Sequence, residues 1–286
     1  MGMNRLRLVL EMIKFEHTVF ALPFAFLGAF LAAHGFPGWR TSALVVIAMA
    51  GARSCAMAFN RLVDLPYDSA NPRTSSRALP RGLVSRSFVA AFALISAAIF
   101  ILAAWMLNDL AFYLSPLALL IVLGYSYTKR FTVLSHLFLG LSLGIAPVGG
   151  WIAVTGTLAV EPFFLAAAVM FWVAGFDIIY ACQDVDFDRR TGLYSLPSRI
   201  GIKNSLRISA IFHWVMIVLL LLVFAWSKLS AVSWFGLLFV GLALVYEHHL
   251  VKPNDLSKVN AAFFTVNGVV SLALLIFVGI DLCLFA

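Results

Sequence analysis

Long apolar stretches, separated by short polar segments, make up most of this 286-residue chain. Nine of them reach the roughly 20 residues that a helix needs to cross a membrane. They lie at 18–34, 42–62, 88–107, 110–128, 134–154, 163–182, 205–226, 231–251 and 261–282. Period-two alternation is absent, and backbone groups in lipid need partners within their own segment. The pattern therefore predicts an all-α integral membrane protein whose residues 1–286 form a single domain.

The composition agrees with this prediction. Hydrophobic residues make up 63% of the chain and charged residues only 12%, whereas soluble domains carry about 25% charged residues. The net charge of +7 would also suit a nucleic-acid-binding protein. The basic residues lie in short loops between apolar stretches, however, so the pattern argues against nucleic acid as a partner and for the lipid bilayer.

The basic residues also indicate an orientation. If the nine stretches cross the membrane in turn, almost all of the 20 lysine and arginine residues fall on one side. The other side carries Arg40 and Lys228, while Arg53 lies inside the second stretch. Loops rich in lysine and arginine stay in the cytoplasm. We therefore expect a protein of the bacterial inner membrane, with its N-terminus and basic loops cytoplasmic and its C-terminus on the opposite side.

Two of the basic loops also carry acids at helical spacing. Asn60, Asp64 and Asp68 follow one another at intervals of four residues after the second stretch. Asp184 and Asp188 repeat this interval after the sixth stretch. Residues four apart share one face of a helix, so each loop should present a polar stripe where its helix leaves the membrane.

Such stripes suit Mg²⁺, which proteins usually hold through one or two carboxylates together with substrate phosphates. Carboxylates alone would repel a diphosphate, and a bound metal ion reverses that effect. Asp177 and Tyr180 extend the second stripe into the membrane. Asp177 and Asp184 are both candidate catalytic bases, and Tyr180 is a candidate substrate contact. The plain alternative is that these acids and arginines are solvated charges at helix ends.

A third pattern, Tyr125-x-x-x-Lys129, ends the fourth apolar stretch. Together with the acidic patterns at 60–68 and 184–188, it resembles the UbiA superfamily of membrane prenyltransferases. The resemblance spans the whole chain. It implies nine transmembrane helices around a central cavity, with a cytoplasmic cap formed by the loops that carry the patterns.

The resemblance also implies roles for individual residues. Mg²⁺ would be the cofactor, and its ligands would be Asp64, Asp68, Asp184 and Asp188. The residues expected to contact or line the site of the substrates are Asn60, Arg73, Tyr125, Lys129 and Lys14. An interfacial anchor is an equally good interpretation of Lys14, which precedes the first stretch.

The chain departs from the superfamily pattern at Arg61, where many members have aspartate. This variant looks most like quinone-pathway members, including 4-hydroxybenzoate polyprenyltransferases and related menaquinone enzymes. The resemblance thus implies transfer of a prenyl group from a prenyl diphosphate to an aromatic acceptor. Two alternatives stay open: a transporter that uses the intramembrane Asp177 and Arg53, and a prenyltransferase of the haem, chlorophyll or homogentisate type.

Overall fold

Helices account for nearly all of the regular structure. The computed structural model describes residues 5–13 and 18–285, and within them the only β-structure is an isolated bridge between Lys252 and Asp255. The long helices are α2 (Thr18–Ala33), α3 (Trp39–Val63), α5 (Arg86–Leu107), α6 (Asp109–Thr128), α7 (Ser135–Thr155), α8 (Glu161–Ala181), α11 (Ile202–Trp226), α12 (Ala231–Leu250) and α13 (Asn267–Leu284). The short helices are α1 (Arg5–Met12), α4 (Leu65–Ala70), α9 (Val185–Thr191) and α10 (Leu196–Ile200).

The predicted all-α membrane fold is confirmed. Among the described residues, 8 helices are long and apolar enough to cross a membrane. The ninth predicted span corresponds to α2, which is also apolar but only 16 residues long. Two spans contain irregular turns, a 3₁₀ turn at Cys182–Asp184 after α8 and a π-helical turn at Ala261–Val266 before α13.

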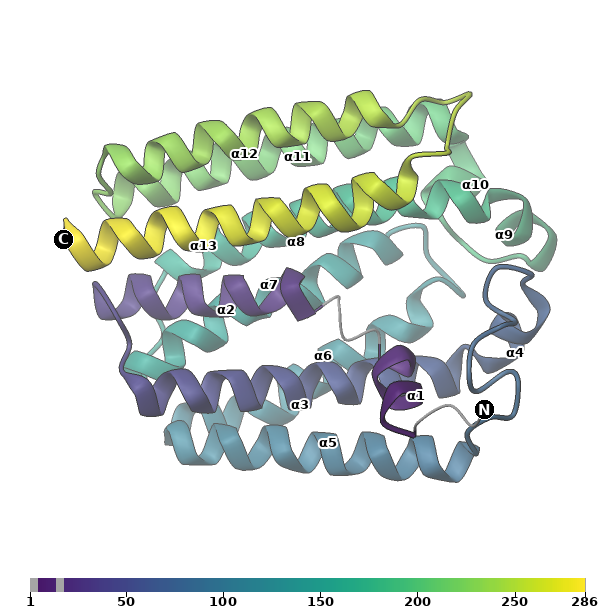
Figure 1. The fold of residues 1–286 in the computed structure, drawn as a ribbon, viewed down its shortest axis with the longest axis horizontal. Coiled ribbons are helices and arrows are strands. Elements are labelled where there is room, and N and C mark those ends of the chain that lie inside the picture. Colours follow the sequence, from purple (N-terminus) through teal and green to yellow (C-terminus); the bar gives the residue numbers. More distant parts are fainter. Residues whose placement is uncertain (1–4, 14–17, 286) are drawn as a thin grey trace.

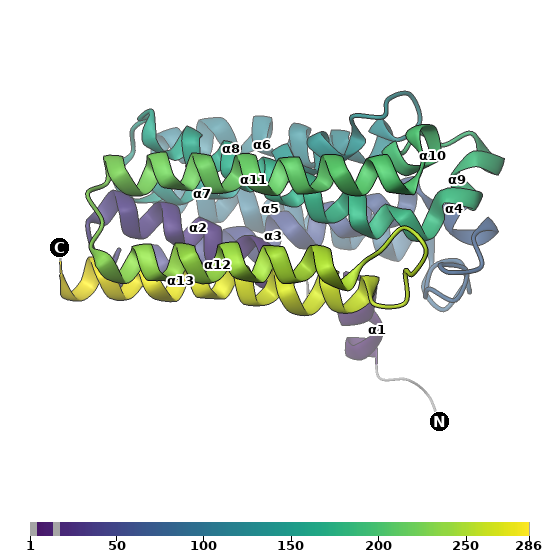
Figure 2. The ribbon, with the colours of Figure 1, turned by 90° about the horizontal axis from the view of Figure 1, so that it is seen from above.

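The long helices run side by side, and the short helices α4, α9 and α10 gather at one end (Figure 1). In this view α8, α11, α12 and α13 lie on one side, α3, α5 and α6 on the other, and α2 and α7 between them. Both views place α4, α9 and α10 at the same end of the bundle, which we call the cap (Figure 2). The C-terminal end of α13 lies at the opposite end of the bundle.

The helices approach one another closely where small residues meet. A Cβ atom added at Gly150 of α7 would lie 1.8 Å from the carbonyl oxygen of Ala25 in α2. A Cβ atom at Gly140 would lie 2.2 Å from the carbonyl oxygen of Met170 in α8. Small residues allow such approaches between helices in membranes, where packing rather than water drives association. These glycines therefore hold α7 tightly against two neighbours.

Side-chain packing is organised in separate clusters. The largest one joins α2, α8, α11, α12 and α13 around fully buried residues such as Trp172 and Met216. A second cluster joins α1, α3 and α5 around Ala58 and Val89. Between these clusters lies a cavity, which contains the candidate site.

Candidate functional site

A cavity of about 830 Å³ lies among α2, α3, α5, α6, α7 and α8. Its polar end is at the cap, and its apolar part extends to Leu158 and Phe163 near the far ends of α7 and α8. Every sequence-predicted site residue that the structure describes lines this cavity: Asn60, Asp64, Asp68, Arg73, Tyr125, Lys129, Asp177, Tyr180, Asp184 and Asp188. Lys14 lies outside the described residues, so its substrate contact stays a prediction.

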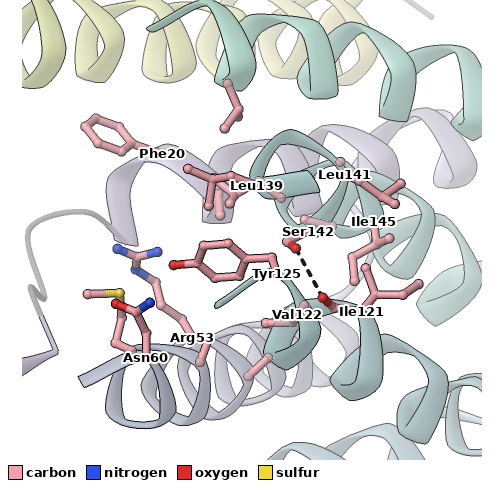
Figure 3. A pocket seen from close by; sticks show the side chains of 18 of the residues that line it. Phe20, Arg53, Asn60, Ile121, Val122, Tyr125, Leu139, Leu141, Ser142 and Ile145 are labelled. Carbon is pink, nitrogen blue, oxygen red and sulfur yellow. Dashed lines mark hydrogen bonds between the residues drawn. The ribbon is translucent and has the colours of Figure 1, made fainter. Parts of the chain in front are cut away.

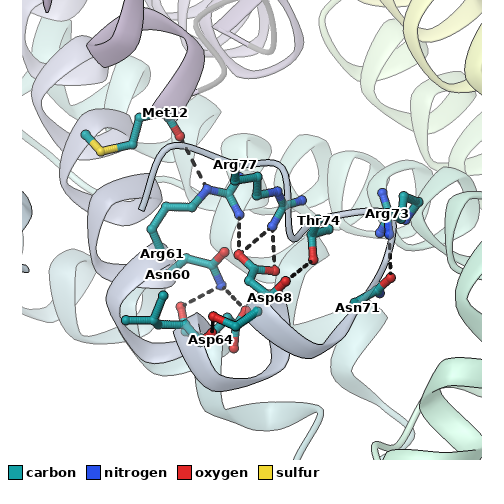
Figure 4. Close-up of polar contacts among 12 residues, drawn as sticks. Met12, Asn60, Arg61, Asp64, Asp68, Asn71, Arg73, Thr74 and Arg77 are labelled. Carbon is teal, nitrogen blue, oxygen red and sulfur yellow. Dashed lines mark hydrogen bonds and ion pairs between the residues drawn. The ribbon is translucent and has the colours of Figure 1, made fainter. Parts of the chain in front are cut away.

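The first acidic stripe follows the end of α3 into the cap. Asn60 is in the last turn of α3, Asp64 joins α3 to α4, and Asp68 lies in α4. The Asn60 side-chain amide donates a hydrogen bond to Asp64 Oδ2 at 2.8 Å (Figure 4). The Asp68 backbone N–H donates to the Asp64 carbonyl oxygen at 2.8 Å. The four-residue spacing therefore places all three side chains at the polar end of the cavity, even though the helix is interrupted.

Arginines neutralise this stripe. Arg77 Nη1 lies 2.7 Å from each carboxylate oxygen of Asp68, which is buried (Figure 4). Arg61, the residue that departs from the superfamily pattern, lies 3.6 Å from Asp68 and donates from Nε to the Met12 carbonyl oxygen at 3.3 Å. Arg61 thus ties the stripe to α1.

The second acidic stripe is interrupted where it leaves the membrane. The 3₁₀ turn at Cys182–Asp184 separates α8, which carries Asp177 and Tyr180, from α9, which carries Asp188. Asp184 immediately precedes α9, and Asp188 is a buried residue of α9. The stripe is therefore not one continuous helical face as predicted, yet its members line the same cavity.

Arg73 joins the two acidic segments. Its Nε donates to Asp184 Oδ1 at 2.9 Å, its Nη2 forms an ion pair with Asp184 Oδ2, and its Nη1 donates to the Tyr180 hydroxyl at 2.8 Å. Asn71 donates to the same carboxylate at 3.2 Å. Carboxylates from distant parts of the sequence therefore converge on one cavity mouth.

The charges at this mouth shift one another's pKa values. Burial raises the pKa of Asp64, against the opposing influence of Lys129. Burial opposes the charged form of Lys129, but the carboxylates of Asp64, Asp177 and Asp188 outweigh it, so the pKa of Lys129 is raised. Burial likewise opposes the charged form of Arg73, but its contacts with Asp184 raise its pKa. Lys129 and Arg73 therefore stay positively charged at neutral pH.

The carboxylates at the cavity mouth fit a metal ion that takes some of its ligands from a bound substrate. Among the residues that the structure describes, no three carboxylate, imidazole or thiol groups lie close enough together to form a metal site alone. Mg²⁺ commonly takes one or two carboxylates and completes its shell with water and substrate phosphates. The carboxylates of Asp64, Asp68, Asp184 and Asp188 fit that arrangement, since each presents oxygen donors to the cavity that a diphosphate would enter.

His136 was not predicted from the sequence to be a site residue, and Arg53 was expected to act only in the transporter alternative. His136 Nδ1 lies 2.7 Å from Asp177 Oδ2, and both residues line the cavity. Arg53 extends from α3 into the cavity beside the Tyr125 hydroxyl (Figure 3), and its buried Nε has no hydrogen-bond partner. The sequence does place His136 on the same helix face as Gly140 and Gly144, because the three residues follow one another at intervals of four. A glycine-lined face is one that a neighbouring helix can approach closely.

The chain is similar to known proteins over nearly its whole length. Residues 21–276 match the model of the UbiA prenyltransferase family. The chain is 30% identical over 253 residues to a 4-hydroxybenzoate octaprenyltransferase of Tolumonas auensis, a match covering 88% of this chain and 87% of the relative. Over 252 residues it is 29% identical to the enzyme of that name from Photobacterium profundum, covering 88% and 86%.

Solved structures show the same fold. The apo structure of a UbiA homologue from Aeropyrum pernix K1 superposes with a TM-score of 0.81 at 34% identity, covering 93% of this chain and 96% of the other. A UbiA homologue from Archaeoglobus fulgidus bound to DMAPP and Mg²⁺ superposes with a TM-score of 0.77 at 19% identity, covering 97% and 99%.

Proposed function

This chain belongs to the UbiA prenyltransferase family, and from that premise we propose that it transfers a polyprenyl group to an aromatic acid of the hydroxybenzoate type. The donor is a prenyl diphosphate, the reaction depends on Mg²⁺, and the product serves ubiquinone or menaquinone biosynthesis. One observation carries the proposal: carboxylates and cations from two distant segments meet at the mouth of one largely apolar cavity.

The diphosphate occupies the cap end of the cavity. Asp64, Asp68, Asp184 and Asp188 would hold Mg²⁺, and the bound ion would supply positive charge that offsets the charge of the diphosphate as it leaves. Lys129 is a fixed cation at the same end, where three carboxylates keep it charged. Arg73 holds Asp184 in this structure and lies within reach of the same phosphate oxygens.

The prenyl chain follows the apolar part of the cavity, away from the cap. During transfer the allylic C–O bond breaks and its electron pair leaves with the diphosphate. The allylic carbon becomes positive, and aromatic rings stabilise such a cation. Phe20, Phe176 and Phe263 supply rings at the cavity wall, with centroids 5.2 to 5.7 Å apart. A carbon of the acceptor ring then forms the new C–C bond, and its proton passes to one of the candidate bases, Asp177 or Asp184.

The acceptor lies deeper than the diphosphate, beside Arg53. Arg53 is partly buried and its buried Nε is unpartnered, which calls for an anionic ligand, because unpaired buried polar groups are costly. A carboxylate matches a guanidinium in geometry and charge. The Tyr125 hydroxyl points toward Arg53 (Figure 3) and can bind the same ligand. An acid of the hydroxybenzoate type supplies such a carboxylate, and the acceptors of the haem, chlorophyll and homogentisate alternatives stay as outcomes of the test below.

Direct assay of the purified protein tests the proposal. The protein is incubated with Mg²⁺, a prenyl diphosphate and a panel of hydroxylated aromatic acceptors, and products are identified by mass. We expect a prenylated hydroxybenzoate, no product in EDTA, and recovery when Mg²⁺ is restored. Asp64→Asn and Asp184→Asn should each lower turnover at least about 100-fold, which is the scale of losing a transition-state charge contact. Transfer that persists in EDTA, or full turnover by either variant, would contradict the metal site.

The transporter alternative predicts a different result. Its candidate residues, Asp177 and Arg53, lie in the same cavity as the acidic stripes rather than in a separate pathway. If the protein were a transporter, liposomes containing it would move a solute across the membrane without forming a prenylated product. We also propose that the protein lies in the bacterial inner membrane with the cap in the cytoplasm, as the basic loops indicate.

A further inference from the structure

His136 forms a hydrogen bond to Asp177 through one ring nitrogen and to the cap through the other. It is the second residue of α7, and its imidazole is buried. Nδ1 lies 2.7 Å from Asp177 Oδ2 in α8. Nε2 accepts a hydrogen bond from the backbone N–H of Leu196, the first residue of α10, at 3.2 Å. One imidazole thus connects a carboxylate inside the cavity to the segment that follows the second acidic stripe.

These two contacts specify the tautomer. A backbone amide can only donate, so Nε2 carries no proton and Nδ1 carries the imidazole proton. Nδ1–H therefore donates to Asp177. A proton on Nε2 would set two N–H groups against each other. In the structure, His136 therefore donates through Nδ1 to Asp177 and accepts through Nε2 from Leu196.

The backbone packing explains why the pair forms. His136, Gly140 and Gly144 lie at intervals of four residues, so they share one face of α7. Gly140 lets that face approach the Met170 carbonyl oxygen of α8, where an added Cβ would lie at 2.2 Å. Asp177 lies two turns beyond Met170 on α8. Close contact at the glycine therefore brings the histidine and the aspartate together.

Asp177 keeps one oxygen available for a ligand. Oδ2 accepts the His136 hydrogen bond, whereas Oδ1 accepts none from the residues that the structure describes. The side chain lines the cavity and is 24% exposed. The cations facing this region are Lys129 and, farther into the cavity, Arg53. Neither is hydrogen-bonded to Asp177 in the structure described here, so His136 alone sets the carboxylate's orientation.

We propose that His136 is a positioning residue for the transfer reaction, orienting Asp177 so that Oδ1 accepts a hydrogen bond from the hydroxyl group of the aromatic acceptor. The inference rests on the proposed function and deepens it. A ring hydroxyl bound in this way is a better electron donor to its own ring, which is the nucleophile of the transfer. Because the contact is to the acceptor, it affects turnover rather than the binding of the prenyl diphosphate.

Two amide variants separate the contacts of His136. In His136→Asn the side-chain amide takes the place of Nδ1 and can still donate to Asp177, but nothing accepts from Leu196. In His136→Gln the amide reaches the place of Nε2 and can accept from Leu196, but the donor to Asp177 is lost. The control is His249→Gln, since His249 is exposed and bonds only the Val245 carbonyl oxygen.

We expect His136→Asn to keep kcat within about threefold of wild type. His136→Gln should lower kcat on the order of 10- to 100-fold, part of the usual effect of a positioned proton-handling group, with little change in KM for the prenyl diphosphate. In an Asp177→Asn background, His136→Gln should have no further effect. His249→Gln should match wild type.

Each other outcome overturns the inference. If Gln retains activity and Asn does not, His136 serves only to anchor Leu196. An equal loss of kcat in both variants, or no loss in either, would show that turnover does not depend on the hydrogen bond from Nδ1 to Asp177. These outcomes leave the proposed function intact when the wild-type protein is active. A wild-type protein that forms no prenylated product overturns the proposed function and this role together.

A spectroscopic measurement checks the tautomer without any assay of activity. In protein labelled with ¹⁵N at histidine, the signals that disappear in His136→Gln should be those of a neutral imidazole protonated at Nδ1. Signals of an imidazolium, or of a ring protonated at Nε2, would contradict the proposed donor.

Discussion

At the scale of single residues, the site is a set of charges kept in pairs. Asp68 contacts Arg77 and Arg61, Asp184 contacts Arg73, and Asp64 lies 3.7 Å from Arg130. An unpaired carboxylate would be costly at this depth. The acids can therefore stay charged without a diphosphate, and a divalent cation must compete with arginines for them.

Arg77→Gln should lower stability, because it removes the two short contacts to the buried Asp68 and leaves only Arg61 at 3.6 Å. Breaking one side of such a pair costs about 1–3 kcal/mol when part of it reaches solvent. Thermal unfolding in detergent measures the effect. Arg81→Gln is the control, since Arg81 is exposed in the same loop. Equal melting temperatures for the two variants would show that the pair contributes nothing.

Arg53→Met should weaken binding of the acceptor without affecting the donor. Losing a charge-assisted hydrogen bond costs about 1.5–3 kcal/mol, so KM for a hydroxybenzoate should rise roughly 10- to 100-fold. KM for the prenyl diphosphate should stay within about twofold. The matched substrate is the corresponding phenol without its carboxylate, which wild type and variant should use equally poorly. A similar KM rise for both acceptors would rule out a carboxylate contact.

At the scale of helices, glycines on α7 decide which side chains meet. Gly150 packs against Ala25 of α2, and Gly140 packs against Met170 of α8. The same helix carries His136 at its cap end, so its spacing from α8 controls the contact with Asp177. Irregular turns matter at the same scale, because the 3₁₀ turn at Cys182–Asp184 directs Asp184 toward Arg73.

Two adjacent glycines on α7 allow a matched test of this packing. A Cβ at Gly150 would lie 1.8 Å from the Ala25 carbonyl oxygen, whereas a Cβ at Gly149 meets nothing within 4 Å. Gly150→Ala should therefore destabilise the protein by about 1–3 kcal/mol through overpacking. Gly149→Ala should be neutral or slightly stabilising, because alanine favours the helix by up to about 1 kcal/mol. Thermal unfolding compares them, and equal stability would refute the close α2–α7 contact.

At the scale of the whole molecule, the bundle has a polar end and an apolar end. The acidic stripes and Lys129 lie at the cap, while α13 ends on the opposite side (Figure 1). The loop at 251–260 joins α12 to α13 at the cap end. The cavity therefore receives a charged head group from one side and a hydrocarbon chain within the membrane.

Thiol labelling can measure this orientation in intact bacterial cells. In a Cys283→Ser background, which removes the exposed thiol, the remaining Cys55 and Cys182 are buried. Phe285→Cys, just beyond α13, should react with a membrane-impermeant reagent from outside. Asn254→Cys, in the exposed loop at the cap end, should react only after the membrane is permeabilised. The reverse pattern would place the cap outside the cytoplasm.

The sequence by itself determined the membrane class, the spans and the acidic stripes. These features depend on hydrophobicity and helical spacing, which act along the chain and are visible in it. It missed the break at Cys182–Asp184, because the apolar pattern continues across the turn.

Only the tertiary structure decided which distant residues meet. The contacts of Arg73 with Asp184 and of His136 with Asp177 join residues 111 and 41 positions apart. The unpartnered Nε of Arg53 is likewise a property of its surroundings in the fold. Such contacts depend on how closely helices approach one another and on how their side chains pack. Both depend on several segments at once, so the residue spacing within one segment does not reveal them.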